Sequence, residues 1–228
     1  MKFQYAGPDG EIEAEISGFV ADGINAEGEY IEIQTCNFGY IRKKALALQG
    51  RMRVVYPVII TKYLEVFNRR GRLLYRKKSP RKGTPWDIFD VLIYAPDLPV
   101  IPGLVIELAL VDAAEKRVRD GKGSWRRKGV SIRDRHLLAL LDRVTLEKPS
   151  DYNRFVPFQK KEEFTSALLA KKAGISVHSA RKTLYVLAKL GIVKKIGKQG
   201  NSLVYVRKGI RGWKSKKKKQ SKNDCACH

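Results

Sequence analysis

The fold of the N-terminal part is decided by the stretch Tyr30-Ile31-Glu32-Ile33-Gln34-Thr35. Apolar and polar residues alternate along it, and this alternation predicts a β-strand. Glu32 and Gln34 then share one face of the strand, while Ile31 and Ile33 share the other.

The preceding strand is predicted to begin at Phe19 and to end at Asp22. Turn-forming residues 25–28 between the two strands predict a hairpin that can bring Asp22 beside Glu32. Two carboxylates and the amide of Gln34 would then form an oxygen-rich pocket, which suits a hard cation such as Mg²⁺. The alternative is that these residues form the solvated face of an antiparallel strand.

The chain has 228 residues and a net charge of +23. This charge favours a polyanionic partner, nucleic acid first and an anionic membrane second. Residues 150–206 carry a net +8, residues 207–228 another +8, and residues 1–149 only +7. By this division most of the charge density lies in the C-terminal part.

Several classes of protein are disfavoured by the pattern. No apolar run approaches the roughly 18 residues that a membrane-spanning helix needs. Residues 1–10 lack the apolar core of a secretory signal. The three cysteines, Cys36, Cys225 and Cys227, do not make a disulfide framework. We therefore expect a protein of the reducing cytoplasm.

A helix is predicted after Asn37, which is a good helix cap. Arg42 falls within the apolar arc of this helix near its start, so its cation is expected to point back toward Glu32. The alternative is that the Arg42 side chain extends out of the apolar stripe to water. Lys43 and Lys44 are expected to lie off the stripe and to be solvated.

The other elements up to residue 149 are predicted from apolar runs, turn residues and caps. They are a buried strand 53–60, a hairpin about residues 70–71, a basic loop 77–83, a helix from residue 84 toward 94, a strand 104–111 and a helix 131–141. Pro149-Ser150-Asp151 predicts a domain boundary.

A second basic loop spans residues 120–129 and contains Trp125, followed by Arg126 and Arg127. Cations next to a stacking ring suit the backbone and a base of a nucleic acid, so these three residues are predicted to bind it. The alternative is a solvated hairpin tip with Trp125 folded under it.

Two helices, a tight turn and a hairpin are predicted between residues 164 and 207. The helices span about 166–173 and 176–190, and the hairpin strands span 192–196 and 202–206. This order resembles a winged helix-turn-helix domain. The passage from Leu187 to Val193 is similar to that family's step from helix to wing.

The resemblance implies that the second helix enters the major groove of DNA by its N-terminal half. DNA contacts are assigned to the polar residues of this helix and to one residue of the wing: His178, Ser179, Arg181, Lys182, Tyr185, Lys189 and Lys198. Some winged helices bind only protein, and this is the alternative.

The element order of residues 11–60, with Asp22 and Glu32-x-Gln34 ahead of a helix, resembles the PD-(D/E)XK nuclease superfamily. The resemblance implies that Asp22 and Glu32 bind Mg²⁺ or Mn²⁺. It also implies that a third residue, usually Lys, orients or deprotonates the attacking water. Gln34 stands in that position here, and Arg42 is the candidate for the missing charge. The implied catalytic set is therefore Asp22, Glu32, Gln34 and Arg42.

Together these patterns predict an α/β (α+β) fold in three parts. They are a restriction-endonuclease-like mixed sheet with flanking helices over residues 1–149, a winged-helix domain over 150–208 and a disordered lysine-rich tail over 209–228. The expected function is a DNA-binding protein with a magnesium-dependent nuclease domain. The alternative is a non-catalytic regulator or repair-complex adaptor with a degenerate nuclease fold. The expected partner is double-stranded DNA and not a membrane, while the choice between monomer and homodimer is left open.

Overall fold

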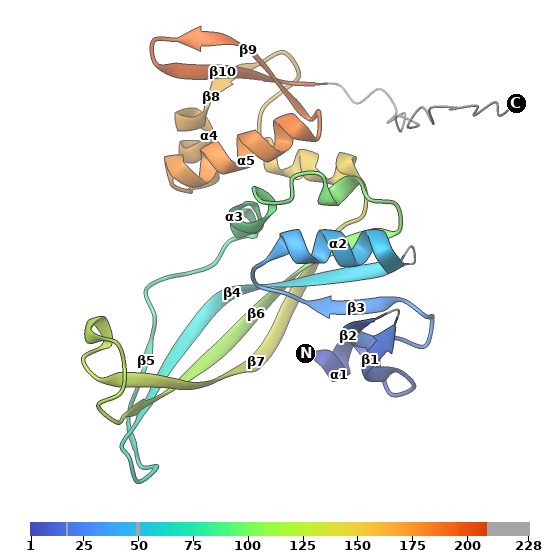
Figure 1. The fold of residues 1–228 in the computed structure, drawn as a ribbon. Helices are drawn as coiled ribbons and strands as arrows, with labels where there is room; N and C mark the ends of the chain where they lie inside the picture. The colour runs from blue at the N-terminus through green and yellow to red at the C-terminus, as the bar shows by residue number, and fades with distance from the viewer. Residues whose placement is uncertain (17, 49–50, 209–228) are drawn as a thin grey trace, which may run out of the picture.

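The computed structural model describes residues 1–16, 18–48 and 51–208. The predicted tail, residues 209–228, lies outside these described residues. Figure 1 shows a large sheet of long strands, helices against it, and a smaller unit of helices and strands that follows in the chain. The predicted class, a mixed α and β fold with a large mixed sheet and flanking helices, is confirmed.

Within the described residues, seven strands form the large sheet in the order β1-β2-β3-β4-β6-β7, with β5 paired to β4. Their bounds are β1 (Glu11–Ile16), β2 (Phe19–Ile24), β3 (Tyr30–Ile33), β4 (Met52–Phe67), β5 (Leu73–Lys78), β6 (Leu104–Arg119) and β7 (Val130–Leu146). β4 runs parallel to both β3 and β6, and the other pairs are antiparallel. The predicted hairpin around residues 25–28 is confirmed as β2 and β3.

Two helices cover opposite faces of this sheet. Tyr5 of α1 (Lys2–Ala6) packs in a cluster with Val55, whereas Phe38 of α2 (Phe38–Leu48) packs in a cluster with Val54. Neighbouring strand residues point to opposite faces, so the two helices lie on the two sides of β4. The helix predicted from residue 84 is present as η1 (Pro85–Ile88) and α3 (Phe89–Leu92), followed by η2 (Leu98–Val100).

The predicted helix over residues 131–141 is wrong, because these residues belong to β7. The run from Leu137 to Leu141 is rich in Leu and Ala, which favour helix in isolation. In the structure, β7 pairs with β6 from Val130 opposite Arg119 to Leu146 opposite Ile106. This pairing between distant segments overrides the local preference.

The C-terminal part contains β8 (Glu163–Thr165), α4 (Ser166–Ala173), α5 (Val177–Lys189), β9 (Val193–Gln199) and β10 (Ser202–Arg207). Thr165, and not Ser166, caps α4, and Gly174 ends it with a positive φ of 67°. Ser176 caps α5 as predicted, by accepting a hydrogen bond from the backbone N–H of Ser179. β10 pairs with both β8 and β9, so helix, turn, helix and hairpin follow in the predicted order.

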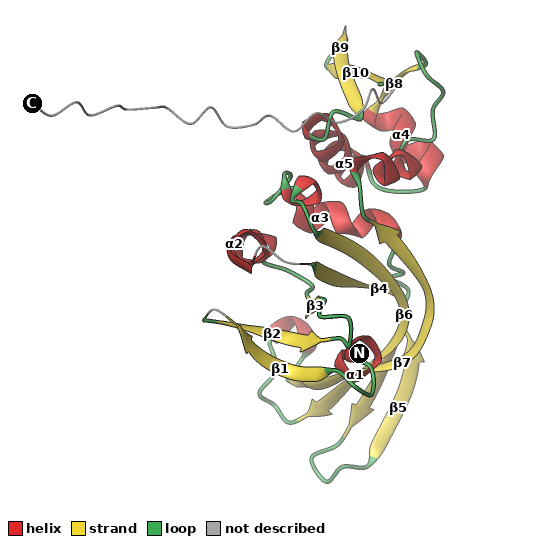
Figure 2. Ribbon diagram, turned by 90° about the vertical axis from the view of Figure 1, so that its right-hand side faces the viewer, coloured by secondary structure: helices red, strands yellow, loops and turns green. Residues whose placement is uncertain are grey.

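Figure 2 shows the C-terminal helices next to α3 at one end of the large sheet. One hydrophobic core runs from the sheet into this C-terminal part. It joins Phe38 of α2, Ile106 of β6, Phe155 of η4 (Pro149–Phe155) and Leu184 of α5. α3 also packs against α5. The proposed boundary after residue 149 therefore crosses a continuous core. No helix in the described part of the chain is long and apolar enough to span a membrane.

Candidate functional site

Asp22 and Glu32 lie near each other on neighbouring strands. The antiparallel pairing of β2 and β3 sets Ile24 against Tyr30 and Gly23 against Ile31, and Asp22 and Glu32 are the next residue of each strand beyond these pairs. The charge of Asp22 raises the pKa of Glu32, as expected for two neighbouring carboxylates. The Asp22 carboxylate also accepts a hydrogen bond from the backbone N–H of Ile33 at 2.8 Å. The hairpin thus positions both carboxylates at one place.

Lys44 of α2 reaches the same place, and the expectation that it is solvated is wrong. Lys44 is 1 % exposed, and its ammonium group donates to the Glu32 carboxylate and, at 2.6 Å, to the carbonyl of Val20. Lys44 follows the buried Ile41 by three residues, so it lies on the buried stripe of α2. This spacing is the signal that could identify Lys44 from sequence.

The Asp22 carboxylate pairs with a second lysine, Lys2 of α1. Lys2 Nζ lies 2.9 Å from Asp22 Oδ1 and 3.0 Å from Glu13 Oε1. Hydrogen bonds to Asp22 and Glu13 raise the pKa of Lys2. The Lys2 side chain is 37 % exposed, so it can rotate into water, whereas the buried Lys44 cannot.

The donor set fits a partly hydrated divalent cation. Burial raises the pKa of Glu32 above its ordinary value. The hydrogen bond and charge of Lys44 lower this pKa, whereas the negative charge of Asp22 raises it further. A desolvated carboxylate that faces another negative charge is stabilised by a bound cation. Mg²⁺ is commonly held by one or two carboxylates, with water and substrate phosphate as further ligands. Among the described residues no three His, Cys, Asp or Glu side chains gather into a metal site. Among the described residues, the ligands of such an ion would therefore be Asp22 and Glu32. Lys2 must rotate away from Asp22 before the ion can bind.

The prediction that Arg42 points toward Glu32 is wrong. Its guanidinium pairs with Asp97, with Nε 2.8 Å and Nη2 2.7 Å from Asp97 Oδ2. Positions 42 and 44 of a helix lie about 200° apart around its axis, which separates Arg42 from the face that Lys44 occupies. Gln34 follows the end of β3 and is half-buried.

The predicted DNA-contacting face of α5 is open in part. Four of its residues are exposed at helical spacing: His178, Arg181, Tyr185 and Lys189. Lys182 is less exposed and pairs with Asp90 of α3 at 2.9 Å. Ser179 is half-buried beside Ser176, with the two Oγ atoms 2.9 Å apart, and Lys198 is exposed on β9. One edge of the α5 face is thus covered by the sheet domain.

The second basic loop forms the tip of the β6–β7 hairpin, with η3 (Trp125–Arg127) at its end. Trp125 is 83 % exposed, so the alternative in which it folds under the loop is wrong. The guanidinium of Arg126 lies 5.5 Å from the centre of the Trp125 ring. An exposed ring and adjacent cations are thus available to a ligand at this tip.

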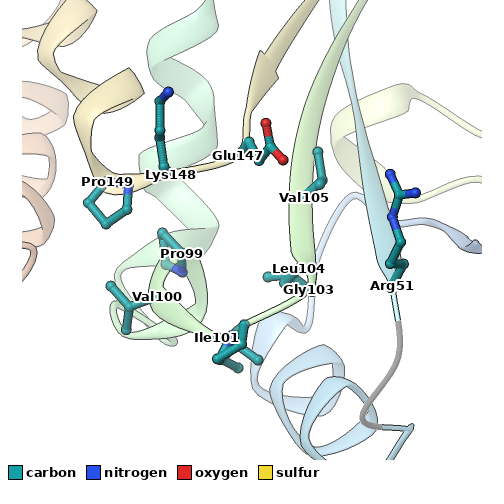
Figure 3. Close-up of a pocket in the computed structure, with 11 residues that line it drawn as sticks. Arg51, Pro99, Val100, Ile101, Gly103, Leu104, Val105, Glu147, Lys148 and Pro149 are labelled. Carbon is teal, nitrogen blue, oxygen red and sulfur yellow. The ribbon is translucent and has the colours of Figure 1, made fainter. Parts of the chain in front are cut away.

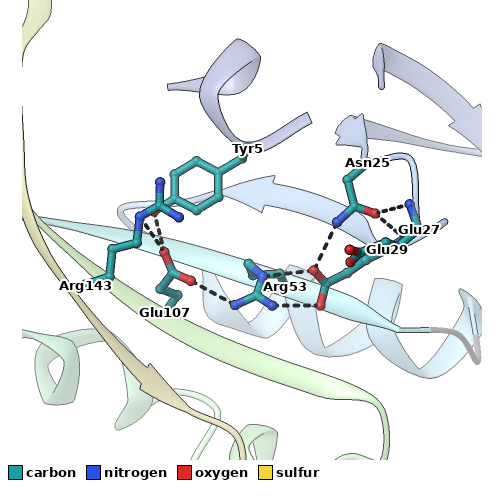
Figure 4. A network of polar contacts seen from close by, with 7 residues as sticks. All are labelled: Tyr5, Asn25, Glu27, Glu29, Arg53, Glu107 and Arg143. Carbon is teal, nitrogen blue, oxygen red and sulfur yellow. Dashed lines mark hydrogen bonds and ion pairs between the residues drawn. The ribbon is translucent and has the colours of Figure 1, made fainter. Parts of the chain in front are cut away.

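A polar network that the sequence did not reveal lies on the α1 face of the sheet (Figure 4). Arg53 of β4 joins two buried carboxylates, with Nε 2.9 Å from Glu29 Oε2 and Nη1 2.8 Å from Glu107 Oε2. The Tyr5 hydroxyl donates to Glu107 at 2.5 Å, and burial raises the pKa of Tyr5. Arg143 covers the Tyr5 ring at 4.8 Å. The network fastens α1 to the sheet, and no spacing rule links residues from segments so far apart.

A pocket of about 370 Å³ lies where β4 and β6 begin (Figure 3). It is lined by Arg51, residues 99–105 and residues 147–149. The close-up shows the charged groups of Arg51, Glu147 and Lys148 spread around it without converging on one point. It therefore offers no arrangement of groups for chemistry.

Comparison with known proteins identifies a family for most of this chain. A family model described as a domain of unknown function (DUF8091) matches residues 1–147. An uncharacterized protein of Treponema pallidum (strain Nichols) is 27% identical over 195 residues, which cover 85% of this chain and 77% of the relative. That stretch is longer than residues 1–147, so the similarity extends into the C-terminal part. No solved structure matches the chain. Because the family model covers more than half of its residues, the chain belongs to the DUF8091 family.

Proposed function

We propose that this protein binds double-stranded DNA and cuts it with a divalent metal ion through a PD-(D/E)XK nuclease-like domain over residues 1–149. The element order supports the proposal: α1, three antiparallel strands, α2 and then β4 parallel to β3. The exposed free thiol of Cys36 is compatible with the reducing cytoplasm as its compartment.

The observation that carries the proposal is the meeting of Asp22, Glu32 and Lys44. Two carboxylates and one lysine are the residue types that the nuclease resemblance implies. Lys44 brings from a helix the cation that Gln34 does not bring from the strand. Its bonds to Glu32 and to the Val20 carbonyl hold the ammonium group in a fixed position.

Each residue has a distinct role in the proposed reaction. Asp22 and Glu32 would hold the metal ion through their carboxylate oxygens. When bound, Mg²⁺ or Mn²⁺ polarises the scissile phosphate and lowers the pKa of bound water. Lys44 lowers the pKa of Glu32 against the effect of burial and so favours the ionised ligand. Lys2 covers Asp22 until a ligand replaces it.

We also propose that residues 150–208 form a winged helix-turn-helix domain that contributes to DNA binding. The exposed face of α5 and the exposed Lys198 on β9 support this role. Lys182 contributes less than the sequence suggests, because its charge is already paired with Asp90. Arg181 and Lys189 are the stronger candidates for binding phosphates.

Incubation of the whole protein with supercoiled plasmid and Mg²⁺ or Mn²⁺ tests the cutting activity. We expect the wild type to yield nicked or linear DNA. Asp22→Asn and Glu32→Gln should each slow cutting by about 100-fold or more, as expected when a group that stabilises transition-state charge is removed. Glu13→Gln is the matched control, because it removes a carboxylate that contacts Lys2 but stands outside the proposed ligand set. Cutting at the wild-type rate by Glu32→Gln would show that the site is wrong.

A non-catalytic DNA-binding regulator or adaptor is the second candidate. The pairs Lys44–Glu32 and Lys2–Asp22 favour it, because they neutralise both carboxylates without a metal ion. The plasmid assay separates the two candidates. Tight DNA binding by the wild type with no cutting in either metal would support the regulator and contradict the nuclease.

A further inference from the structure

The outer parts of β4, β6 and β7, together with the whole of β5, form an arm that extends away from α2 and α3 (Figure 1). The arm comprises residues 62–82, with the end of β4 and all of β5, and residues 115–135, with the end of β6, η3 and the start of β7. These two segments hold eighteen basic and four acidic side chains, a net charge of +14. Because residues 1–149 carry +7 in total, the rest of that domain carries −7. The positive charge of the sheet domain is therefore concentrated in the arm.

A buried carboxylate organises the cations on one face of the arm. Glu115 of β6 is 2 % exposed and lies 3.7 Å from Lys62, 2.5 Å from Arg117 and 3.1 Å from Arg135. Burial raises the pKa of Glu115, but hydrogen bonds from Arg117 and Arg135 outweigh this and leave the pKa below its ordinary value. Three cations and one carboxylate leave a net +2, held on strands and not on a flexible loop.

Two hollows lie along this face. The outer hollow has a volume of about 510 Å³. Four of the described residues that line it are cationic and none is acidic. The lining residues are Tyr75, Arg119, Arg126, Arg127, Lys128 and Val130. The inner hollow, of about 320 Å³, includes the cations Lys62, Arg81 and Arg135 and the carboxylates of Asp87 and Glu115. From Glu115 to Arg119 along β6 is roughly 13 Å, close to the rise of four base pairs of duplex DNA.

The inner hollow adjoins the end of β3. Thr35, one of its lining residues, follows Glu32 by three positions. β3 and β5 both pair with β4 on the edge away from β6, and Gly83 lies between them with its N–H bonded to the Ile59 carbonyl at 2.7 Å. A chain of phosphates lying along the arm would therefore lead to the end of the strand that carries Glu32.

We propose that the arm is the main DNA-binding surface of this protein and that one backbone of the duplex lies across both hollows, up to the end of β3. The proposal rests on the proposed function, since it names where the DNA binds. It goes further by assigning most of the binding free energy to the arm and a smaller share to α5.

The chemistry of the arm favours a polyanion over a second copy of the chain. β5 is exposed along its whole length and carries Arg76, Lys77 and Lys78. Edge-to-edge pairing of two β5 strands would bring these cations against their own copies, which is unfavourable. Aromatic rings stand next to cations on the opposite face as well, with Arg76 4.4 Å from the Tyr63 ring centre. Cations combined with aromatic rings are typical of protein surfaces that bind nucleic acids.

Binding of the whole protein to a short fluorescent DNA duplex, measured by anisotropy over a range of salt concentrations, tests the proposal. The arm variant is Arg119→Gln/Arg126→Gln/Arg127→Gln, which leaves the Glu115 cluster intact. The α5 variant is Arg181→Gln/Lys189→Gln/Lys198→Gln. The control for bulk charge is Lys43→Gln/Lys148→Gln/Lys171→Gln, three exposed cations outside both surfaces.

The arm variant should bind at least about tenfold more weakly than the wild type. Its slope of log K against log salt should become shallower by about 2 to 3, because each phosphate that is no longer neutralised removes roughly 0.9 from the slope. The α5 variant should be weakened less, and the bulk control least. Thermal melting that matches the wild type checks that each variant is folded.

Each other outcome overturns a defined part of the account. A larger loss of affinity in the α5 variant, or equal losses in all three, overturns the arm as the main surface and leaves DNA binding by the protein intact. Failure of the wild type to bind duplex DNA at low salt overturns the proposed function as well. Tighter binding of an RNA duplex or of single-stranded DNA, tested in parallel, overturns duplex DNA as the ligand.

Discussion

Replacing Lys44 with methionine is expected to lower the free energy of unfolding by about 3–5 kcal/mol at neutral pH, because Glu32 would keep a buried charge without its partner. Methionine is unbranched and similar in length, so the loss of stability reports mainly on charge and not on a cavity. Urea unfolding of the whole protein, followed by circular dichroism, measures the change.

The pH dependence and a double variant identify the cause. Burial already holds the pKa of Glu32 above its ordinary value of 4.5, and removal of Lys44 raises it further. A raised carboxyl pKa costs no stability below about 4.5, where the folded and unfolded chains are both protonated, and costs stability as the pH rises through the folded pKa. The deficit of Lys44→Met should therefore shrink toward acid pH, and Lys44→Met/Glu32→Gln should recover most of it at neutral pH. A deficit that is constant with pH and unchanged in the double variant would contradict a buried ion pair.

A similar loss of stability, about 3–5 kcal/mol, is expected from Arg53→Met. This change leaves Glu29 and Glu107 without their main cation, and these carboxylates are only 1 % and 3 % exposed. Because Tyr5 bonds to Glu107, the attachment of α1 to the sheet should weaken as well. Thermal unfolding of the whole protein measures the destabilisation, and hydrogen exchange of residues 2–6 should increase.

Arg143→Met is the matched control in the same network. Arg143 Nε lies 3.7 Å from Glu107, and its side chain is 47 % exposed, so its removal should cost about 0–1 kcal/mol. Equal destabilisation by the two variants would mean that packing around β4 and β7, and not the buried charges, stabilises this region.

Local patterns allowed part of this molecule to be predicted from its sequence. The β2–β3 hairpin follows from alternation and turn residues that are adjacent in the chain. The helix cap at Ser176 and the turn at Gly174 likewise depend only on residues close in sequence. β7 was not predictable, because the run from Leu137 to Leu141 becomes a strand only through its pairing with β6.

The candidate site shows the same division between local and long-range information. Asp22 and Glu32 are brought together by a short hairpin, which sequence reveals. The spacing of Lys44 from Ile41 places it on the buried stripe of α2, but spacing alone does not favour a buried lysine over a solvated one. The Glu32 carboxylate that makes burial favourable is brought to Lys44 only by the tertiary structure. The concentration of charge in the arm could not be predicted from sequence for a related reason. Residues 62–82 and 115–135 become one surface only when β4 pairs with β6, which follows it much later in the chain.

Mn²⁺ binding to the whole protein, followed by electron paramagnetic resonance of the free ion, tests the proposed metal site most directly. We predict that a single ion binds, that Asp22→Asn and Glu32→Gln abolish this binding, and that Lys2→Ala strengthens it several-fold by uncovering Asp22 Oδ1. Glu13→Ala controls for the general removal of a nearby carboxylate and should leave binding in place. Binding that is unchanged in Glu32→Gln, or no binding even in Lys2→Ala, would contradict the account.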